Sequence, residues 1–127
     1  MRYHLDTSFL IDWRRSSPKI IGLRDEIAAR LHVVSIDPIV HTEFFAAPRT
    51  DRTYDAVFES VIRLGTILPL TPQVSRLAAT WLGPMDQPQR RARFADALVA
   101  AVAYLDNATL VTSDTAMPLF PVPVLLY

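Results

Sequence analysis

Four acidic residues lie in or directly after apolar sequence, where a lone buried charge is costly. Asp6 ends the short stretch Tyr3-His4-Leu5, and the others are Glu43, Asp96 and Asp114. Carboxylates are the ligands that hard cations such as Mg²⁺ and Mn²⁺ prefer. A divalent ion held by them would neutralise a phosphate and lower the pKa of a bound water. We therefore interpret the four acids as candidate catalytic and metal-binding residues of a phosphodiester hydrolase, with one tight ion and a second, looser one.

Each of these acids also has a structural interpretation. Asp6 could cap a helix or form a buried salt bridge, and Glu43 could face solvent. Asp96 could stabilise the positive end of a helix, and Asp114 could cap a turn at 114–118. For a single acid the two interpretations are about equal. The four together, placed on one fold, favour the metal site.

Other polar residues are weaker candidates. Asp12 lies on the expected first helix and could support the site from behind, whereas Asp37 is better explained as a helix cap before Pro38. The three histidines show no metal-ligand spacing, so we expect them to be structural. They are His4, His32 and His41.

Apolar periodicity and Pro/Gly punctuation predict strands that alternate with helices. Strands are expected at 2–6, 33–36, 67–68, 109–112 and 122–126. Helices are expected at 8–15, 18–31, from Asp37-Pro38 to before Pro48, 51–64, from Pro72 to Gly83-Pro84, and 93–105, with a polar loop at 84–92. This alternation predicts a parallel sheet with helices on both faces.

A strand order of 3-2-1-4-5 would make the first and fourth strands neighbours. Asp6 and Asp114 would then project from adjacent strand ends, at the edge where open α/β sheets bind ligands. Glu43 and Asp96 would reach the same crevice from helices.

Bulk properties narrow the function classes. The chain has 127 residues, half of them hydrophobic, which predicts one folded domain over 1–127. It has no cysteine, so disulfides, iron–sulfur clusters and thiolate zinc sites are excluded. The first residues lack the apolar core of a signal peptide, and the longest apolar run, Ala97 to Leu105, is too short to span a membrane. We expect a soluble cytoplasmic protein. Its net charge of zero excludes a bulk polyanion binder.

Four segments, in order, resemble the motifs of PIN-domain ribonucleases, in particular the VapC-type toxins of type II toxin–antitoxin systems. They are Leu5-Asp6-Thr7-Ser8-Phe9-Leu10, Ile39-Val40-His41-Thr42-Glu43-Phe44, Asp96-Ala97-Leu98-Val99-Ala100-Ala101-Val102-Ala103 and Leu110-Val111-Thr112-Ser113-Asp114. Each motif alone is weak, whereas four in order are fairly specific. The similarity runs from about residue 2 to the end of the chain.

The resemblance implies a three-layer α/β/α PIN-like domain with a parallel sheet of about five strands. It also implies a Mg²⁺- or Mn²⁺-dependent endoribonuclease that is a homodimer and is neutralised by a cognate VapB-type antitoxin. Asp6, Glu43, Asp96 and Asp114 correspond to the acidic metal site of that family. One departure precedes Asp96: the family often has a glycine and a further acid there, and this chain has Arg91-Ala92-Arg93-Phe94-Ala95.

Two surfaces follow from this hypothesis. Arg90, Arg91 and Arg93 are expected to meet the RNA backbone at the mouth of the site. An antitoxin helix is expected to lie in an apolar groove on the first two helices, and to send an arginine into the carboxylates. The expected groove residues are Phe9, Leu10, Trp13, Ile20, Ile21 and Leu23.

Other functions fit the same residues less well. A haloacid-dehalogenase-type phosphatase needs a second acid two residues after Asp6, where Ser8 stands. A receiver domain needs a lysine late in the chain, and the only lysine is Lys19. The remaining alternative is a catalytically weak or inactive PIN-like scaffold that binds RNA or protein. Loss of metal-dependent RNA cleavage in Asp6→Asn would separate the enzyme from the scaffold.

Overall fold

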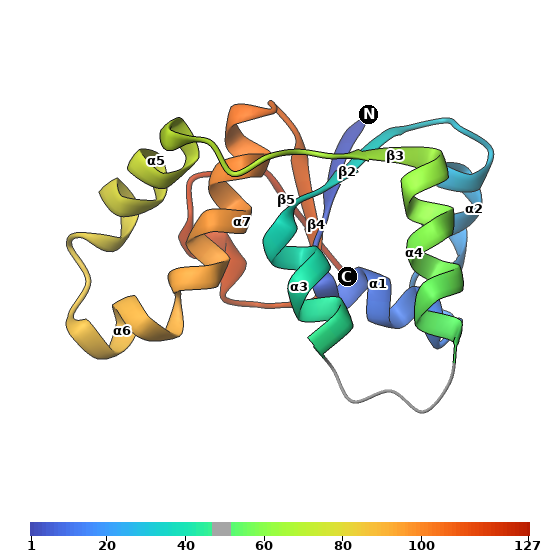
Figure 1. The fold of residues 1–127 in the computed structure, drawn as a ribbon, viewed down its shortest axis with the longest axis horizontal. Helices are drawn as coiled ribbons and strands as arrows, with labels where there is room; N and C mark the ends of the chain where they lie inside the picture. Colours follow the sequence, from blue (N-terminus) through green and yellow to red (C-terminus); the bar gives the residue numbers. More distant parts are fainter. Residues whose placement is uncertain (47–51) are drawn as a thin grey trace.

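A parallel five-stranded sheet forms the centre of the protein (Figure 1). The computed structural model describes residues 1–46 and 52–127. Its strands are β1 (Arg2–Leu5), β2 (Val33–Ile36), β3 (Gly65–Ile67), β4 (Thr109–Thr112) and β5 (Val124–Leu126). Its helices are α1 (Thr7–Arg14), α2 (Ile21–Ala28), α3 (Pro38–Ala46), α4 (Thr53–Leu64), α5 (Pro72–Leu82), α6 (Gln87–Ala92) and α7 (Phe94–Leu105), with a 3₁₀ turn at Met117–Leu119.

The order of the strands is β3-β2-β1-β4-β5, and all four pairings are parallel. The predicted order 3-2-1-4-5 is therefore confirmed, as is the three-layer α/β/α architecture. β1 lies in the middle, with His4 opposite Ser35 of β2 and Leu110 of β4. The residues that follow β1 and β4 consequently meet at one edge of the sheet.

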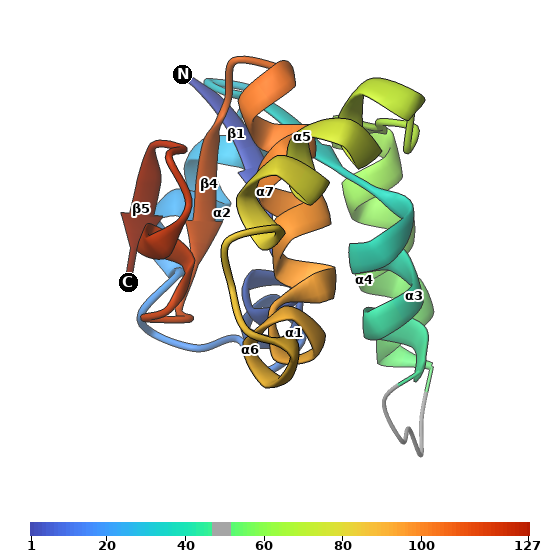
Figure 2. The same ribbon diagram turned by 90° about the vertical axis from the view of Figure 1, so that its left-hand side faces the viewer.

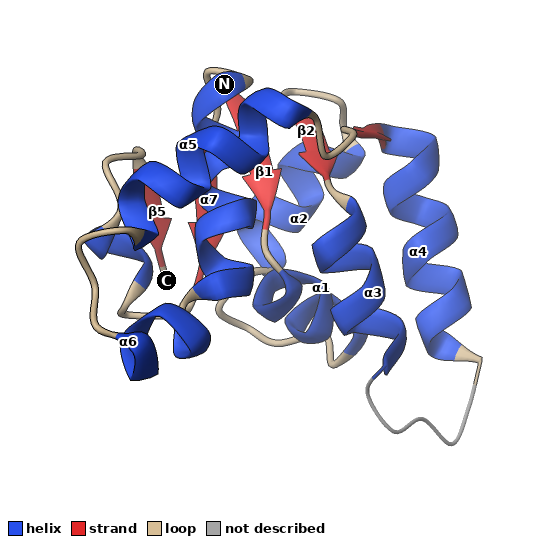
Figure 3. Ribbon diagram, turned by 60° about the vertical axis from the view of Figure 1, so that its left-hand side comes forward, coloured by secondary structure: helices blue, strands red, loops and turns tan. Residues whose placement is uncertain are grey.

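Helices cover the sheet from two sides. α5 and α7 lie in front of β1 and β4 in Figure 2, whereas α2 and α4 lie on the opposite side of the sheet in Figure 1. Figure 3 shows that β1 and β2 point the same way and that α1 and α3 begin just beyond their tips. The start of α7 and the short helix α6 lie at this same end of the molecule.

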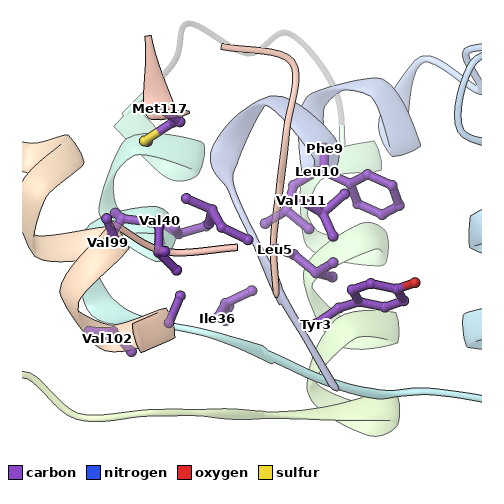
Figure 4. Close-up of a cluster of buried hydrophobic side chains, with 14 of the residues drawn as sticks. Tyr3, Leu5, Phe9, Leu10, Ile36, Val40, Val99, Val102, Val111 and Met117 are labelled. Atoms are coloured by element: carbon purple, nitrogen blue, oxygen red, sulfur yellow. The ribbon is translucent and has the colours of Figure 1, made fainter. Parts of the chain in front are cut away.

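The core is formed where strand residues meet helices from both layers. In Figure 4, Val99 and Val102 of α7 lie on one side of Leu5, and Phe9 and Leu10 of α1 on the other. Leu5, Phe9 and Leu10 have no exposed surface. Burying side chains of this size stabilises the fold by roughly 1.5–3 kcal/mol each. This packing holds the end of β1 and the start of α1 rigidly in place.

The segment 84–92, predicted as a polar loop, contains the helix α6. Asp86 accepts a hydrogen bond from the backbone N–H of Gln89 at 2.9 Å, which caps the helix. Pro88 lies in the first turn, where its missing N–H costs nothing. The prediction was wrong because a short, wholly exposed helix has no apolar stripe to reveal it.

Several boundaries differ from the prediction. The helix expected at 18–31 is shorter, since α2 spans Ile21–Ala28, and the third strand begins two residues early, at Gly65. A Cβ atom at Gly65 would lie 2.5 Å from the carbonyl oxygen of Val34, so only glycine allows β3 to approach β2 there. The predicted limits near 47 and 51 lie outside the described residues. None of the helices in the described ranges is long and apolar enough to cross a membrane.

Candidate functional site

Asp6 is the most buried of the four predicted acids, with 7% of its surface exposed. It stands at the N-cap of α1, yet within the described chain its side chain makes no capping hydrogen bond. Instead its Oδ2 accepts a hydrogen bond from Thr112 Oγ1 at 2.7 Å. Burial raises the pKa of Asp6; hydrogen bonds from Thr112 and the Thr7 backbone oppose this, and nearby carboxylates add to it. The carboxylate therefore bonds to the side chain of Thr112 on β4 rather than capping α1, and it faces other negative charges.

Thr112, at the end of β4, connects Asp6 to Asp114. Its hydroxyl oxygen donates to Asp6 and accepts a 3.0 Å hydrogen bond from the backbone N–H of Asp114. Ser8 supports this junction, because its Oγ lies 3.3 Å from Thr112 Oγ1 and accepts from the N–H of Ser113. The sheet register thus fixes the distance between the two acids.

Asp114 has two roles. Its Oδ1 accepts a hydrogen bond from the backbone N–H of Ala116 at 2.9 Å, which confirms the predicted turn. Its Oδ2 lies 3.8 Å from Nη1 of Arg93. One oxygen holds the turn, and the other faces the charged groups of α7.

Glu43 reaches the same region from the exposed side of α3. Thr7 Oγ1 donates a 3.0 Å hydrogen bond to Glu43 Oε1, which connects the start of α1 to α3. Desolvation raises the pKa of Glu43, the Thr7 hydrogen bond opposes the rise, and the charges of Asp6 and Asp96 add to it. Glu43 is therefore not a freely solvated residue of the helix surface.

Asp96 lies in the first turn of α7. Its Oδ2 accepts a 3.0 Å hydrogen bond from Nη1 of Arg93. Burial raises the pKa of Asp96; the Arg93 contact lowers it, and the charge of Asp114 raises it. All four predicted residues are thus close enough to influence one another electrostatically, and we call Asp6, Glu43, Asp96 and Asp114 the acid cluster.

The four side chains of the acid cluster are not gathered into a compact set of metal ligands. Within residues 1–46 and 52–127, no three His, Cys, Asp or Glu side chains are arranged to hold one metal ion together. Among the residues that the structure describes, Arg93 pairs with both Asp96 and Asp114 and brings a positive charge to them. The carboxylates and hydroxyls gathered here are nevertheless the donors that a hard divalent ion takes.

The sequence profile of the PIN domain matches residues 3–121. This chain belongs to the PIN-domain family. The match contains every residue of the acid cluster and reaches past the 3₁₀ turn after β4. No curated protein matches the sequence significantly.

Solved structures support the same fold. The chain resembles one chain of VapBC2 from Rickettsia felis, bound to a DNA fragment from its promoter (TM-score 0.74, 17% identity, 100% of this chain and 99% of that one). It also resembles DNA-bound VapBC from Salmonella typhimurium (TM-score 0.76, 17% identity, 98% and 97%). A third neighbour is VapC20 of Mycobacterium tuberculosis, a Sarcin-Ricin loop cleaving toxin (TM-score 0.70, 20% identity, 91% and 92%).

A second polar cluster of this PIN domain, formed by residues of β1 and β2 and the residue after β2, was not predicted from the sequence. Nδ1 of His4 lies 2.8 Å from Ser35 Oγ, and Nε2 of the same ring lies 2.7 Å from Asp37 Oδ2. Asp37 Oδ1 accepts hydrogen bonds from the N–H groups of Ile39 and Val40, so its predicted role as a cap is confirmed. We call His4, Ser35 and Asp37 the His4 network. Its sequence signal is a polar residue inside each of two apolar strands.

Asp12 was expected to support the site from behind, and its hydrogen-bond partner is Tyr127. The hydroxyl of Tyr127 donates a 3.0 Å hydrogen bond to Asp12 Oδ2. Burial raises the pKa of Tyr127, and its neighbours include the Ser8 and Ser113 side chains. Tyr127, directly after β5, thus connects Asp12 of α1 to the residues that follow β4. The sequence gives no signal for this contact between positions 12 and 127.

The predicted antitoxin groove on the first two helices is wrong for half of its residues. Phe9, Leu10 and Ile20 have at most 1% of their surface exposed and form the core. Trp13 packs edge-on against Phe9 and is only partly buried. These residues are buried because α1 packs against the sheet, α3 and α4 at once, so more than one face of the helix is covered.

Proposed function

We propose that this chain is a divalent-metal-dependent endoribonuclease whose catalytic and metal-binding residues are Asp6, Glu43, Asp96 and Asp114. The observation that carries the proposal is the buried carboxylate of Asp6. It does not cap α1, and its pKa is raised by burial and by the charges of Asp96 and Asp114. Repulsion between neighbouring carboxylates is relieved when a cation or a substrate binds to them. Carboxyl groups with perturbed pKa values are therefore good markers of functional sites.

The donor set fits Mg²⁺ or Mn²⁺. All four acids offer carboxylate oxygens, the adjacent Thr7, Ser8 and Thr112 offer hydroxyls, and the chain has no cysteine. When bound, the ion supplies charge neutralisation at the scissile phosphate and a more acidic water. A raised carboxyl pKa also fits, since the cation favours the ionised form that the apo site disfavours.

The chain's own residues orient the acids. The Thr112 hydroxyl fixes one oxygen of Asp6, and the Thr7 hydroxyl fixes one oxygen of Glu43. Both threonines donate to carboxylates, so they favour the charged form that holds a cation. Because β1 and β4 are paired and packed in the core, these positions are preorganised before substrate arrives.

RNA is the proposed substrate because one structural neighbour is described as a toxin that cleaves the Sarcin-Ricin loop. Single-stranded loops suit such a site, since their bases are unstacked and their backbone is accessible. A hollow of about 430 Å³ is lined by Gln87, Arg90, Arg91 and Phe94, just before the turn that carries Asp96. Phe94 is 59% exposed. An exposed aromatic ring with two arginines can bind bases and phosphates.

The proposal includes partners of two kinds. Two of the neighbours are VapBC complexes, so we expect a VapB-type antitoxin to bind this chain and block the acid cluster. We also expect a homodimer. The chain should be toxic when expressed alone and tolerated when the antitoxin is co-expressed.

The test is cleavage of a labelled single-stranded RNA by the purified chain. Cleavage is expected with Mg²⁺ or Mn²⁺, and it should stop in excess EDTA. Asp96→Asn should abolish it, whereas the matched surface variant Asp25→Asn should cleave as wild type, because Asp25 is exposed on α2 and pairs with Arg24. Robust cleavage in EDTA would refute the metal proposal. RNA binding without cleavage under every condition would show the non-catalytic scaffold instead.

A further inference from the structure

Arg93 is held where two helices meet. It ends α6 and precedes α7, so that its N–H bonds to the carbonyl of Gln89 and its carbonyl accepts from Ala97. Its guanidinium extends toward the acid cluster, with Nη1 3.0 Å from Asp96 Oδ2 and 3.8 Å from Asp114 Oδ2. Backbone contacts on both sides therefore fix the residue that brings a positive charge to two candidate metal ligands.

We propose that Arg93 is a resident cation of the acid cluster, which occupies the side between Asp96 and Asp114 and limits the chain to one bound divalent ion. A second ion binds only when Arg93 is removed. This inference rests on the proposed function, because it assumes that the acid cluster binds a divalent ion.

An ordinary helix salt bridge does not account for both contacts. An arginine three residues before an aspartate commonly pairs with it along one helix, and Asp96 alone would fit that pattern. Asp114, however, follows β4 and comes from another part of the chain. The same nitrogen approaches carboxylates that β4 and α7 bring together. Arg93 thus neutralises the junction of two elements, as a bridging metal ion would.

The balance of charge favours one ion. Four ionised carboxylates and one guanidinium carry a net charge of minus three. One divalent ion reduces this to minus one, whereas two would reverse it to plus one. A second ion would also need oxygens that Arg93 already contacts, and at such distances Coulomb repulsion between like charges is strong even in a partly solvated site.

The sequence before Asp96 also supplies a positive charge and no acid. The stretch before Asp96 is Arg91-Ala92-Arg93-Phe94-Ala95, with no acid to help hold another metal ion there. A guanidinium keeps its charge at any physiological pH and has five N–H donors. Nη1 contacts the two carboxylates, and Nε and Nη2 carry further donors that suit a phosphate oxygen entering the site.

The first experiment counts bound ions. Mn²⁺ is titrated into the metal-free chain by isothermal titration calorimetry, and free Mn²⁺ is followed by electron paramagnetic resonance. Wild type should bind one ion per chain, and Arg93→Gln should bind two. Arg91→Gln is the matched control, because it removes the same charge from an exposed residue nearby, and it should bind one ion. Arg93→Lys, which keeps the charge, should also bind one.

The second readout is stability without metal. In Arg93→Gln, Asp96 and Asp114 lose their counter-charge, so the Tm of the metal-free chain should fall by about 2–4 °C, as expected for a partly exposed ion pair. Mn²⁺ should restore this loss and stabilise the variant more than wild type. Arg91→Gln should show neither effect.

The outcomes separate this inference from the proposed function. Two ions per wild-type chain, with RNA cleavage intact, would overturn the role of Arg93 and leave the nuclease standing. One ion of unchanged affinity in Arg93→Gln would do the same. Absence of Mn²⁺ binding in every variant would instead overturn metal dependence itself. If Arg93→Gln fails to fold, Arg93→Met, which keeps a long side chain without the charge, takes its place and should bind two ions.

Discussion

The His4 network and the acid cluster lie at the same end of the sheet, yet their polar groups are used differently. His4 and Asp37 have no exposed surface, and each contacts partners supplied by the fold: Ser35, each other and the first turn of α3. In the acid cluster, three carboxyls have raised pKa values because burial and mutual repulsion exceed what the fold compensates. A satisfied polar group stabilises the fold, whereas an incompletely compensated one is free to bind something else.

The largest effect expected from this comparison is on activity. Asp6→Asn should lower RNA cleavage by about 10³-fold or more, because one buried ligand and its charge are lost. Its stability without metal should stay the same or rise, since the amide still accepts from Thr112 and repulsion falls. Cleavage rates and urea unfolding, measured on the same preparations, test this. A variant that loses its fold along with its activity would place Asp6 among the structural groups.

The next effect is on stability. Asp37→Ala should lower the free energy of unfolding by about 3–5 kcal/mol, because it leaves His4 buried without its partner and uncaps α3. Asp37→Asn is the matched control: its amide can cap the helix and donate to His4 Nε2, so it should cost less than half as much. Urea unfolding with both variants gives the numbers. Equal losses in the two variants would contradict the account of the His4 network.

A smaller effect is expected where the fold supports the acids. Thr112→Val keeps the shape but removes the hydroxyl that connects Asp6 to Asp114. Stability should fall by about 1–2 kcal/mol, and cleavage by roughly 10-fold, as for residues that orient metal ligands. Thr112→Ser should recover most of the cleavage. Full activity in the valine variant would show that Asp6 needs no orientation from β4.

The smallest effect is on the pH dependence of stability without metal. Because the pKa of Asp6 is raised in the folded state, the folded chain retains a proton that the unfolded chain has lost. The free energy of unfolding therefore falls as pH rises from the ordinary pKa of 3.8 through the raised pKa of the folded chain. Asp6→Asn should show a flatter profile over that range, and Mn²⁺ should flatten the wild-type profile. Parallel profiles of wild type and variant, from thermal unfolding, would contradict the raised pKa.

The sequence predicted the sheet and the four acids because both depend on local patterns and simple topology. Apolar runs such as Val33–Ile36 and Thr109–Thr112 mark strands, and the alternation with helices leaves few arrangements. Asp6 and Asp114 follow strands, Asp96 lies in the first turn of α7, and Glu43 lies in the second half of α3, the helix that follows β2. Their placement follows once the strand order is known.

The missed features depend on long-range partners. His4 and Ser35 are opposite each other only because β1 and β2 pair in one register, and Arg93 approaches Asp114 only after β4 and α7 are packed. The burial of individual side chains was also hard to predict, since Ile20 belongs to the core although it lies in the turn before α2. Residues that contact several elements cannot be ranked from local periodicity.

The helix α3 is fixed at its first turn, so a change of its angle there displaces Glu43. The His4 network clamps the first turn of α3 to β1 and β2, and Glu43 stands about 8 Å farther along the helix axis, at 1.5 Å per residue. A tilt of about 10° at the clamp would carry the Glu43 carboxylate by more than an ångström, a displacement that can lower turnover by about a hundredfold. Substitution of the buried His4 can therefore displace the carboxylate of Glu43 although the two residues are not in contact.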